Sequence, residues 1–123
     1  MAAAVYSISR VEKFLDDAHV ITWTLTDSDN YGQALEMPGS ADRTIQLTGT
    51  FGGGTVVMQG SNLLSPTEGT DTDWFNLTDP QGTAISKTTA GGESILELTR
   101  WIRPKITGST GAALVASLLV KRK

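Results

Sequence analysis

The chain has 123 residues, the usual size of one domain, and this length excludes two well-filled cores. It contains no cysteine, which excludes disulfides, thiolate metal sites and cysteine nucleophiles and suits synthesis in a reducing cytoplasm. The net charge of −3 excludes a global basic field that would attract nucleic acid. We therefore expect a single domain over residues 1–123 that folds without a metal or a cofactor.

The ends of the chain carry no targeting signal that we recognise. Residues 1–5 lack a basic stretch followed by a long apolar run, and the longest apolar run, 112–120, is too short to cross a bilayer as a helix. The sequence thus predicts a soluble protein that binds no membrane. We expect an extended N-terminal arm over residues 1–6 and a solvated basic tail over residues 121–123.

The first third of the chain is mostly strand-like. Residues 5–10 and 19–26 alternate with period two, which indicates strands with one buried face. Residues 43–51 alternate most regularly, with Ile, Leu and Phe on one face and Thr and Gln on the other, so the register of this strand should be firm. Only residues 11–17 show helical spacing, and this segment is short enough to be a single turn or a loop instead.

Glycine, proline and aspartate mark the turns of the central region. Three glycines at 52–54 separate two strand-like runs, which predicts a hairpin turn because glycine adopts positive φ without strain. Residues 62–72 are polar and contain Pro66, which predicts a surface loop. Strand character returns at residues 73–77, and the sequence Asp-Pro-Gln-Gly at 79–82 is typical of a β-turn.

The last third is predicted to hold three strands. These are residues 94–98, residues 101–106, and residues 113–120, the last of which would also serve as a buried helix. Its position behind a Gly-Ser-Thr-Gly turn and its Val and Leu content favour a strand. Pro104 cannot donate a ladder hydrogen bond, so we expect its strand to lie at a sheet edge or to carry a bulge.

The fold class follows from the number and spacing of these segments. They amount to about eight to ten short antiparallel strands with a turn every eight to twelve residues or so, which is typical of an all-β, single-domain β-sandwich or jelly roll. Only 19% of the residues are charged, and the surface positions are filled with Thr, Ser and Gly instead, as exposed strands prefer. The sequence lacks the alternation of strands with helices that would indicate a parallel α/β fold.

Residues able to carry chemistry are few. The single histidine, His19, begins a strand-like run, where a surface residue is more common than a general base. The possible carboxylate pairs, namely Asp27 with Asp29, Asp71 with Asp73, and Glu93 with Glu97, lie in or beside predicted turns, where such residues bond to the backbone. We therefore expect no enzyme activity and no catalytic or metal-binding residues.

Two possible binding motifs are less favoured than structural roles. Residues 27–32 begin like a calcium-binding loop, but Tyr31 and Pro38 occupy positions where the motif needs oxygen ligands. Trp23, Trp74 and Trp101 would suit a sugar platform, but each lies in an alternating segment, which favours packing in the core. One of them facing outward would indicate a contact with another subunit.

Several segments together resemble a known group of proteins. They are residues 43–62 (RTIQLTGTFGGGTVVMQGSN), the pair Trp74-Phe75, residues 77–82 (LTDPQG) and residues 100–104 (RWIRP). They are similar to short virion proteins encoded among the head genes of tailed phages, some of which are capsid cement (decoration) proteins with jelly-roll-like folds. The similarity runs from about Trp23 to Val120. This chain departs from the pattern by inserting residues 63–68 (LLSPTE) before the next turn and tryptophan.

The resemblance implies a structural role on the outside of a phage head. It predicts a protein made in the cytoplasm of the bacterial host that binds the major capsid protein at capsomer junctions and forms a dimer or trimer. Our candidates for partner contacts are Tyr6, Leu63, Leu64, Arg100 and Arg103, because chain ends, exposed leucines and arginine forks suit adhesion. The alternatives are another virion part, such as a tail, neck or fibre-tip module, and a carbohydrate-binding β-sandwich.

Overall fold

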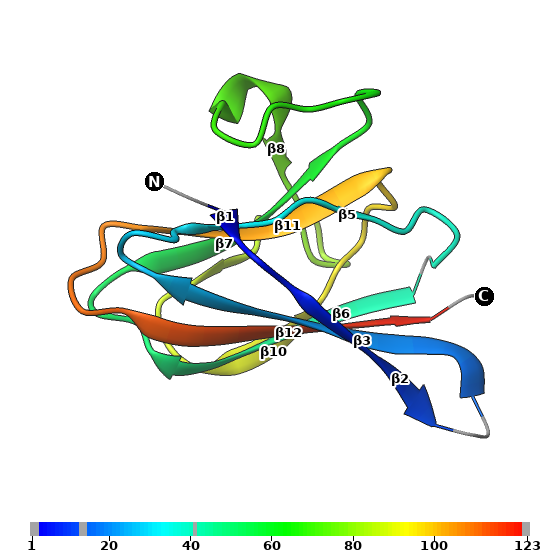
Figure 1. Cartoon of the computed structure of the whole chain (residues 1–123), viewed down its shortest axis with the longest axis horizontal. Coiled ribbons are helices and arrows are strands. Elements are labelled where there is room, and N and C mark those ends of the chain that lie inside the picture. Colours follow the sequence, from blue (N-terminus) through cyan, green and yellow to red (C-terminus); the bar gives the residue numbers. More distant parts are fainter. Residues whose placement is uncertain (1–2, 13–14, 41, 122–123) are drawn as a thin grey trace.

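The structure is an all-β sandwich, as the sequence predicts. The computed structural model describes residues 3–12, 15–40 and 42–121, and for residues 10–12 and 15–17 it describes only the backbone path. These residues form twelve strands in two packed sheets and one short 3-10 helix (Figure 1). No helix among them is long and apolar enough to span a membrane.

The twelve strands divide unequally between the two sheets. Sheet A contains β1 (Ala3–Ala4), β4 (Tyr31–Gly32), β5 (Leu35–Glu36), β7 (Thr55–Ser61), β8 (Phe75–Asn76), β9 (Ser86–Lys87) and β11 (Trp101–Thr107). Sheet B contains β2 (Ser7–Glu12), β3 (Leu15–Thr26), β6 (Asp42–Thr50), β10 (Gly91–Ser94) and β12 (Ala113–Lys121). The 3-10 helix, η1 (Asp71–Asp73), lies in the connection between β7 and β8.

The order of the strands is that of a jelly roll. Sheet B runs β10-β6-β12-β3-β2 and sheet A runs β1-β4-β11-β7-β8, so the chain changes sheet at most of its steps after β3. One four-stranded layer is β10-β6-β12-β3, and the layer that faces it is β4-β11-β7-β8. Most pairs are antiparallel, as predicted, but β1 pairs with β4 in parallel.

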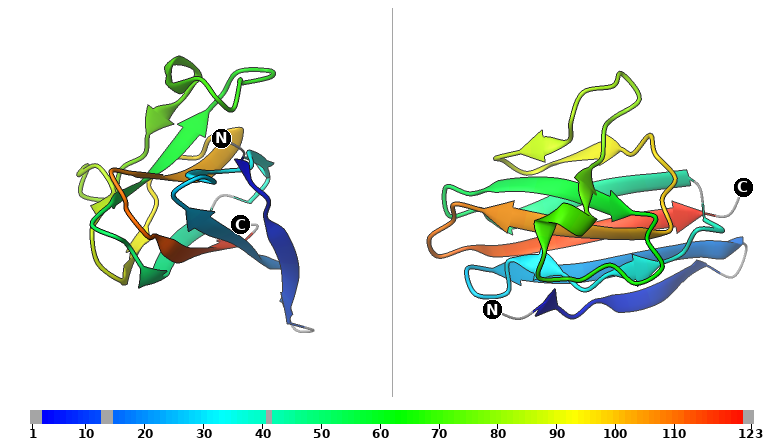
Figure 2. Two further views of the ribbon diagram at one scale, coloured as in Figure 1. Left: turned by 60° about the vertical axis from the view of Figure 1, so that its left-hand side comes forward. Right: turned by 90° about the horizontal axis from the view of Figure 1, so that it is seen from above.

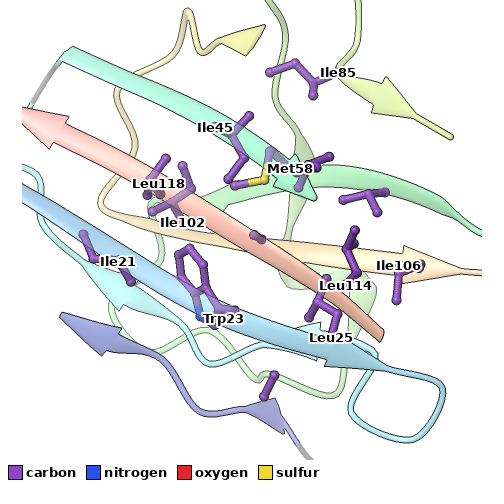
Figure 3. Close-up of a cluster of buried hydrophobic side chains, with 14 of the residues drawn as sticks. Ile21, Trp23, Leu25, Ile45, Met58, Ile85, Ile102, Ile106, Leu114 and Leu118 are labelled. Atoms are coloured by element: carbon purple, nitrogen blue, oxygen red, sulfur yellow. The ribbon is translucent and has the colours of Figure 1, made fainter. Parts of the chain in front are cut away.

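The core fills the space between the two sheets. Ile45 and Leu47 of β6 are buried while the threonines between them are exposed, which confirms the alternation predicted for this strand. Trp23 belongs to this cluster and is fully buried (Figure 3), and its Nε1 donates a hydrogen bond to the backbone oxygen of Gln33 at 3.0 Å. The last predicted segment is the central strand β12, with Leu114, Ala116, Leu118 and Val120 facing the core.

The glycine turn at 52–54 is real, but the predicted hairpin is wrong. The N–H of Gly54 donates to the oxygen of Phe51 at 2.9 Å, and Gly52 and Gly53 have φ of 60° and 75°, as a type I′ turn requires. However, β6 pairs with β10 and β12, and β7 pairs with β8, β9 and β11. The turn therefore carries the chain from sheet B to sheet A.

Pro104 does not lie at a sheet edge, contrary to one of the two predicted alternatives, but the pairing beside it is irregular on one side. Strand β11 is internal, with an unbroken register against β7 in which Pro104 faces Met58. The oxygen of Met58 accepts from the N–H of Leu77 on the far side of β7, so this pair makes no ladder bonds. On the other side of β11, Pro104 lies against Gly32 at the end of β4, and the register shifts by one residue between the pairs Lys105–Tyr31 and Ile102–Leu35. The missing N–H therefore falls where the ladder with β4 and β5 is irregular.

Two other predictions are corrected, one near the N-terminus and one after β10. In the segment 11–17, expected to be helical, residues 11–12 and 15–17 belong to β2 and β3, while Lys13 and Phe14 lie outside the described residues. In the expected N-terminal arm, Ala3–Ala4 pairs with β4 as strand β1. The predicted strand at 94–98 ends at Ser94. Of the expected tail 121–123, only Lys121, the last residue of β12, is described.

Candidate partner-binding surface

Residues 62–74, here called the cap loop, fold over the outer face of sheet A. Figure 1 shows this segment as the projection above β11 and β7, on the side away from sheet B. Predicted as a surface loop, it is largely exposed except for Trp74. The cap loop projects from the sandwich (Figure 1), so the contacts that anchor it determine which of its side chains face solvent.

A buried arginine anchors the cap loop. Arg103 points from β11 to the outer face of sheet A, yet only 1% of its surface is exposed. Its guanidinium lies between two rings, 4.2 Å from the centre of Trp74 and 4.9 Å from that of Tyr31. Its Nε donates to Oε1 of Gln59 at 3.0 Å, and Nη1 donates to the backbone oxygen of Glu68. Arg103 is therefore no free partner contact, and that prediction is wrong because the cap loop covers it.

Asp71 completes the anchor with two cations of sheet A. Its Oδ1 accepts from Nζ of Lys105 at 2.6 Å and lies 3.7 Å from Nη2 of Arg103. The hydrogen bond from Lys105 lowers the pKa of the Asp71 carboxyl, and the charge of Arg103 adds to the effect. Burial lowers the pKa of Arg103, although a guanidinium keeps its proton at any ordinary pH. The ion pairs therefore persist down to acidic pH.

Hydrogen bonds within the cap loop fix its shape. The N–H of Thr67 donates to Oδ2 of Asp73 at 2.8 Å, and its backbone oxygen accepts from Nε1 of Trp74 at 3.1 Å. Oε2 of Glu68 accepts from the N–H of Ala34 at 2.7 Å. These bonds hold the middle of the loop to itself and to sheet A, so the tip is presented in one shape.

Three apolar side chains are exposed on and beside this fixed loop. Leu63, Leu64 and Phe75 are 49%, 75% and 46% exposed, and we call them the apolar patch. Leu63 and Phe75 line one shallow hollow of about 280 Å³. Large side chains left exposed together at one place are typical of contact surfaces. The two leucines were predicted as candidates from the sequence, whereas Phe75 was not.

The other two sequence candidates lie in different surroundings. Arg100 is half-exposed at the base of the cap loop, where its Nε bonds to Oε2 of Glu36 at 2.6 Å and its N–H to Oδ1 of Asn62. Tyr6 lies away from the loop with its ring edge-on to Trp23, 6.1 Å between centres. The structure thus brings Arg100 close to the leucines but keeps Tyr6 apart from them.

The carboxylates considered for chemistry serve the backbone and nearby cations instead. Asp27 accepts from the hydroxyl of Ser109 and the N–H groups of Gly111 and Ala112, and these bonds, led by that of Ser109, lower its pKa. The carboxylate of Glu97 accepts from the N–H and the hydroxyl of Thr78. Burial alone would raise the pKa of Glu97, but the hydrogen bonds together have the larger effect, so its pKa is lowered. Among the described residues, no three His, Cys, Asp or Glu side chains gather as a metal site would require.

Two of the three tryptophans, Trp23 and Trp74, are buried. Trp101 is half-buried, its Nε1 donates to the oxygen of Leu63 at 3.0 Å, and it lines a shallow hollow of about 470 Å³ with polar residues that include Gln33 and Glu68. Another shallow hollow, of about 580 Å³, lies on the outer face of sheet B. Its lining is mainly uncharged and contains no aromatic residue: Val20, Thr44, Ile45, Gln46, Gly91, Gly92, Glu93, Ser94, Ser117 and Leu119.

Comparison with known proteins adds little to this geometry. No family model matches the chain, and no curated protein matches it. Among solved structures, it is similar to the K1 cleaved adhesin domain of Lys-gingipain from Porphyromonas gingivalis W83. That match has 10% identity and a TM-score of 0.41, and covers 98% of this chain and 85% of the other. A TM-score this low carries no argument about function.

Proposed function

We propose that the chain is a structural protein that attaches to a large protein assembly through the apolar patch and performs no reaction of its own. The observation that carries this proposal is the combination of exposed Leu63, Leu64 and Phe75 with a loop held in one shape by buried Arg103. Pre-organisation matters here because a contact loop that is already ordered loses little entropy on binding. A rigid body with an adhesive loop is what such a role needs.

The assembly that we favour is the outer surface of a tailed-phage head. The support is the resemblance of residues 43–62, 77–82 and 100–104 to short virion proteins encoded among head genes. A protein that binds only the assembled shell stabilises it by mass action, which requires adhesion and no catalytic group. The major capsid protein at the junctions between capsomers is then the proposed partner.

The alternatives from the sequence differ in what they require of the surface. A tail, neck or fibre-tip module would use the same patch on another virion part. A carbohydrate-binding sandwich commonly needs an exposed aromatic ring beside polar groups. The hollow on sheet B offers hydroxyls without a ring, and in the hollow beside Trp101 the ring is half-buried and its Nε1 already bonds to Leu63. We therefore expect a glycan array to give no binding above background.

The direct test mixes the purified protein with phage heads that lack it. We expect the protein to sediment with the heads to saturation and to raise the temperature at which the shells open. Replacing Leu64 with serine should weaken binding by about tenfold or more, because contacts at the centre of an interface contribute the most. Leu119→Ser is the matched control, since Leu119 is a 40% exposed leucine on the outer face of sheet B.

Two results would count against the proposal. If the heads neither bind the wild-type protein nor gain thermal resistance, the role on the head is wrong. If Leu64→Ser and Leu119→Ser bind the heads as tightly as the wild type, the apolar patch is not the contact. Urea denaturation of both variants should give unchanged midpoints, which separates a lost contact from a lost fold.

A further inference from the structure

One sheet edge is much longer than the others. The unpaired edges of the described sandwich are β1, β5, β8 and β9 in sheet A, with two residues each, and β10 and β2 in sheet B, with four and six. Natural proteins keep edge strands short, or add charge or proline, because an open edge pairs with another chain. Strand β2 is therefore the edge most open to a strand from outside.

The start of β2 carries neither proline nor charge. Val5, Ser7, Ile8 and Ser9 are all exposed, Val5 at 77% and Ile8 at 48%. Ile8 pairs with Ile21, so both side chains are on the core-facing side of sheet B. Ile21 is fully buried in the core, whereas Ile8 is exposed. Figure 2 shows β2 along one flank of the molecule, extending past the two packed layers. Ile8 is thus a core-type residue without cover.

We propose that β2 pairs antiparallel with β2 of a second copy of this chain, about a two-fold axis that passes beside Ile8. In this register Ile8 faces Ile8, and Ser7 of each copy faces Ser9 of the other. Apolar residues then meet on one face and hydroxyls on the other, and both kinds of cross-strand pair are favourable. An isologous contact needs such self-complementarity, which is why a second copy suits this edge better than an unrelated strand.

The irregularity in β2 sets the limit of this contact. The register between β2 and β3 shifts between Arg10 and Glu12, so regular pairing is available only before that point. A contact of so few residues buries much less surface than a stable dimer does. The dimer should therefore form and dissociate with concentration in solution and become populated where copies are held side by side.

The proposed dimer also determines how the two cap loops are oriented, and the role given to them here rests on the proposed function. A two-fold axis perpendicular to sheet B keeps the core-facing side of both copies on the same side of the joined sheet. Both cap loops, which lie beyond sheet A, then point in one direction (Figure 1). Two apolar patches would therefore engage one surface together and strengthen attachment through effective concentration.

Single cysteines test the register in the protein alone, because the natural chain has none. We expect Ile8→Cys to form disulfide-linked dimers under mild oxidation about tenfold faster than Val5→Cys, although Val5 is more exposed. Equal rates for the two variants would overturn the proposed register. Leu119→Cys, on the outer face of sheet B, gives the rate for random encounter.

Sedimentation measures the dimer itself, without heads. Wild-type protein should show a weight-average mass that rises with concentration up to the millimolar range, whereas Ile8→Lys should stay monomeric because an edge lysine blocks strand pairing. A constant monomer mass for the wild type would refute the dimer. Binding to heads is scored separately, so a monomer that still binds would remove this inference and leave the proposed function intact.

Discussion

The guanidinium of Arg103 shows how a charged side chain is accommodated away from water. Stacking between Trp74 and Tyr31 replaces part of its hydration, and Gln59 and Glu68 accept its hydrogen bonds. A desolvated cation between aromatic rings is stabilised by about 2 kcal/mol, and buried bonds to charged groups add to this. The residue joins β11 to the cap loop, so the shape of the apolar patch depends on it.

Replacing Arg103 with methionine should be strongly destabilising. The change keeps side-chain volume but leaves the acceptors of Gln59 and Glu68 without partners, so we expect a loss of about 2–4 kcal/mol in the free energy of unfolding. Urea denaturation measures it. Arg100→Met is the control, because Arg100 makes an exposed ion pair with Glu36 and should cost about 0.5 kcal/mol or less. Equal losses would contradict a structural role for Arg103.

Two of the three carboxylates with lowered pKa, Asp27 and Asp71, predict how stability falls in acid. The pKa of Asp27 and of Asp71 is lowered from 3.8 in the folded protein. Their contribution to the free energy of unfolding is therefore complete at pH values well above 3.8. It is lost as the pH falls through about 4 and below, because protonation then favours the unfolded chain. Asp27→Asn and Asp71→Asn should each flatten the drop in urea midpoint between about pH 5 and pH 2 relative to Asp42→Asn. An unchanged drop in both variants would contradict these contacts.

At the scale of elements, local patterns predict strands and turns but not their partners. The alternation in β6 and the glycines after it are local features, and the structure confirms the strand and the turn. Whether a tight turn joins two paired strands or two sheets depends on contacts far along the chain, here those of β12 and β11. The same reason explains Pro104, whose missing N–H falls where the register of β11 against β4 and β5 shifts by one residue.

The turn between the sheets gives a prediction that separates its two glycines. A Cβ at Gly52 would lie 2.5 Å from the backbone oxygen of Thr110, whereas a Cβ at Gly53 would meet nothing within 4 Å. Gly52→Ala should therefore cost about 2–4 kcal/mol, from backbone strain and the clash together. Gly53→Asn should cost less than about 1 kcal/mol, since asparagine tolerates positive φ. Similar urea midpoints for the two variants would contradict this geometry.

At the scale of the whole molecule, the fold was more predictable than the candidate site. The alternation of apolar residues with Thr and Ser indicates a jelly-roll-like sandwich, and the strand order of the two sheets has that form. Leu63 and Leu64 could be singled out because two leucines in a polar loop are unusual, and both are exposed. The burial of Arg103 could not be predicted, because it depends on a loop about 35 residues away folding back over β11. The exposure of Phe75 depends on β8 lying at a sheet edge.

A density map of phage heads saturated with the protein tests the central claim most directly. The difference between decorated and bare heads should show added density on the outside, at the junctions between capsomers. When the jelly roll is fitted to that density, the apolar patch at Leu63, Leu64 and Phe75 should face the shell. Added density with the cap loop turned toward solvent, or no added density at saturating protein, would contradict the account.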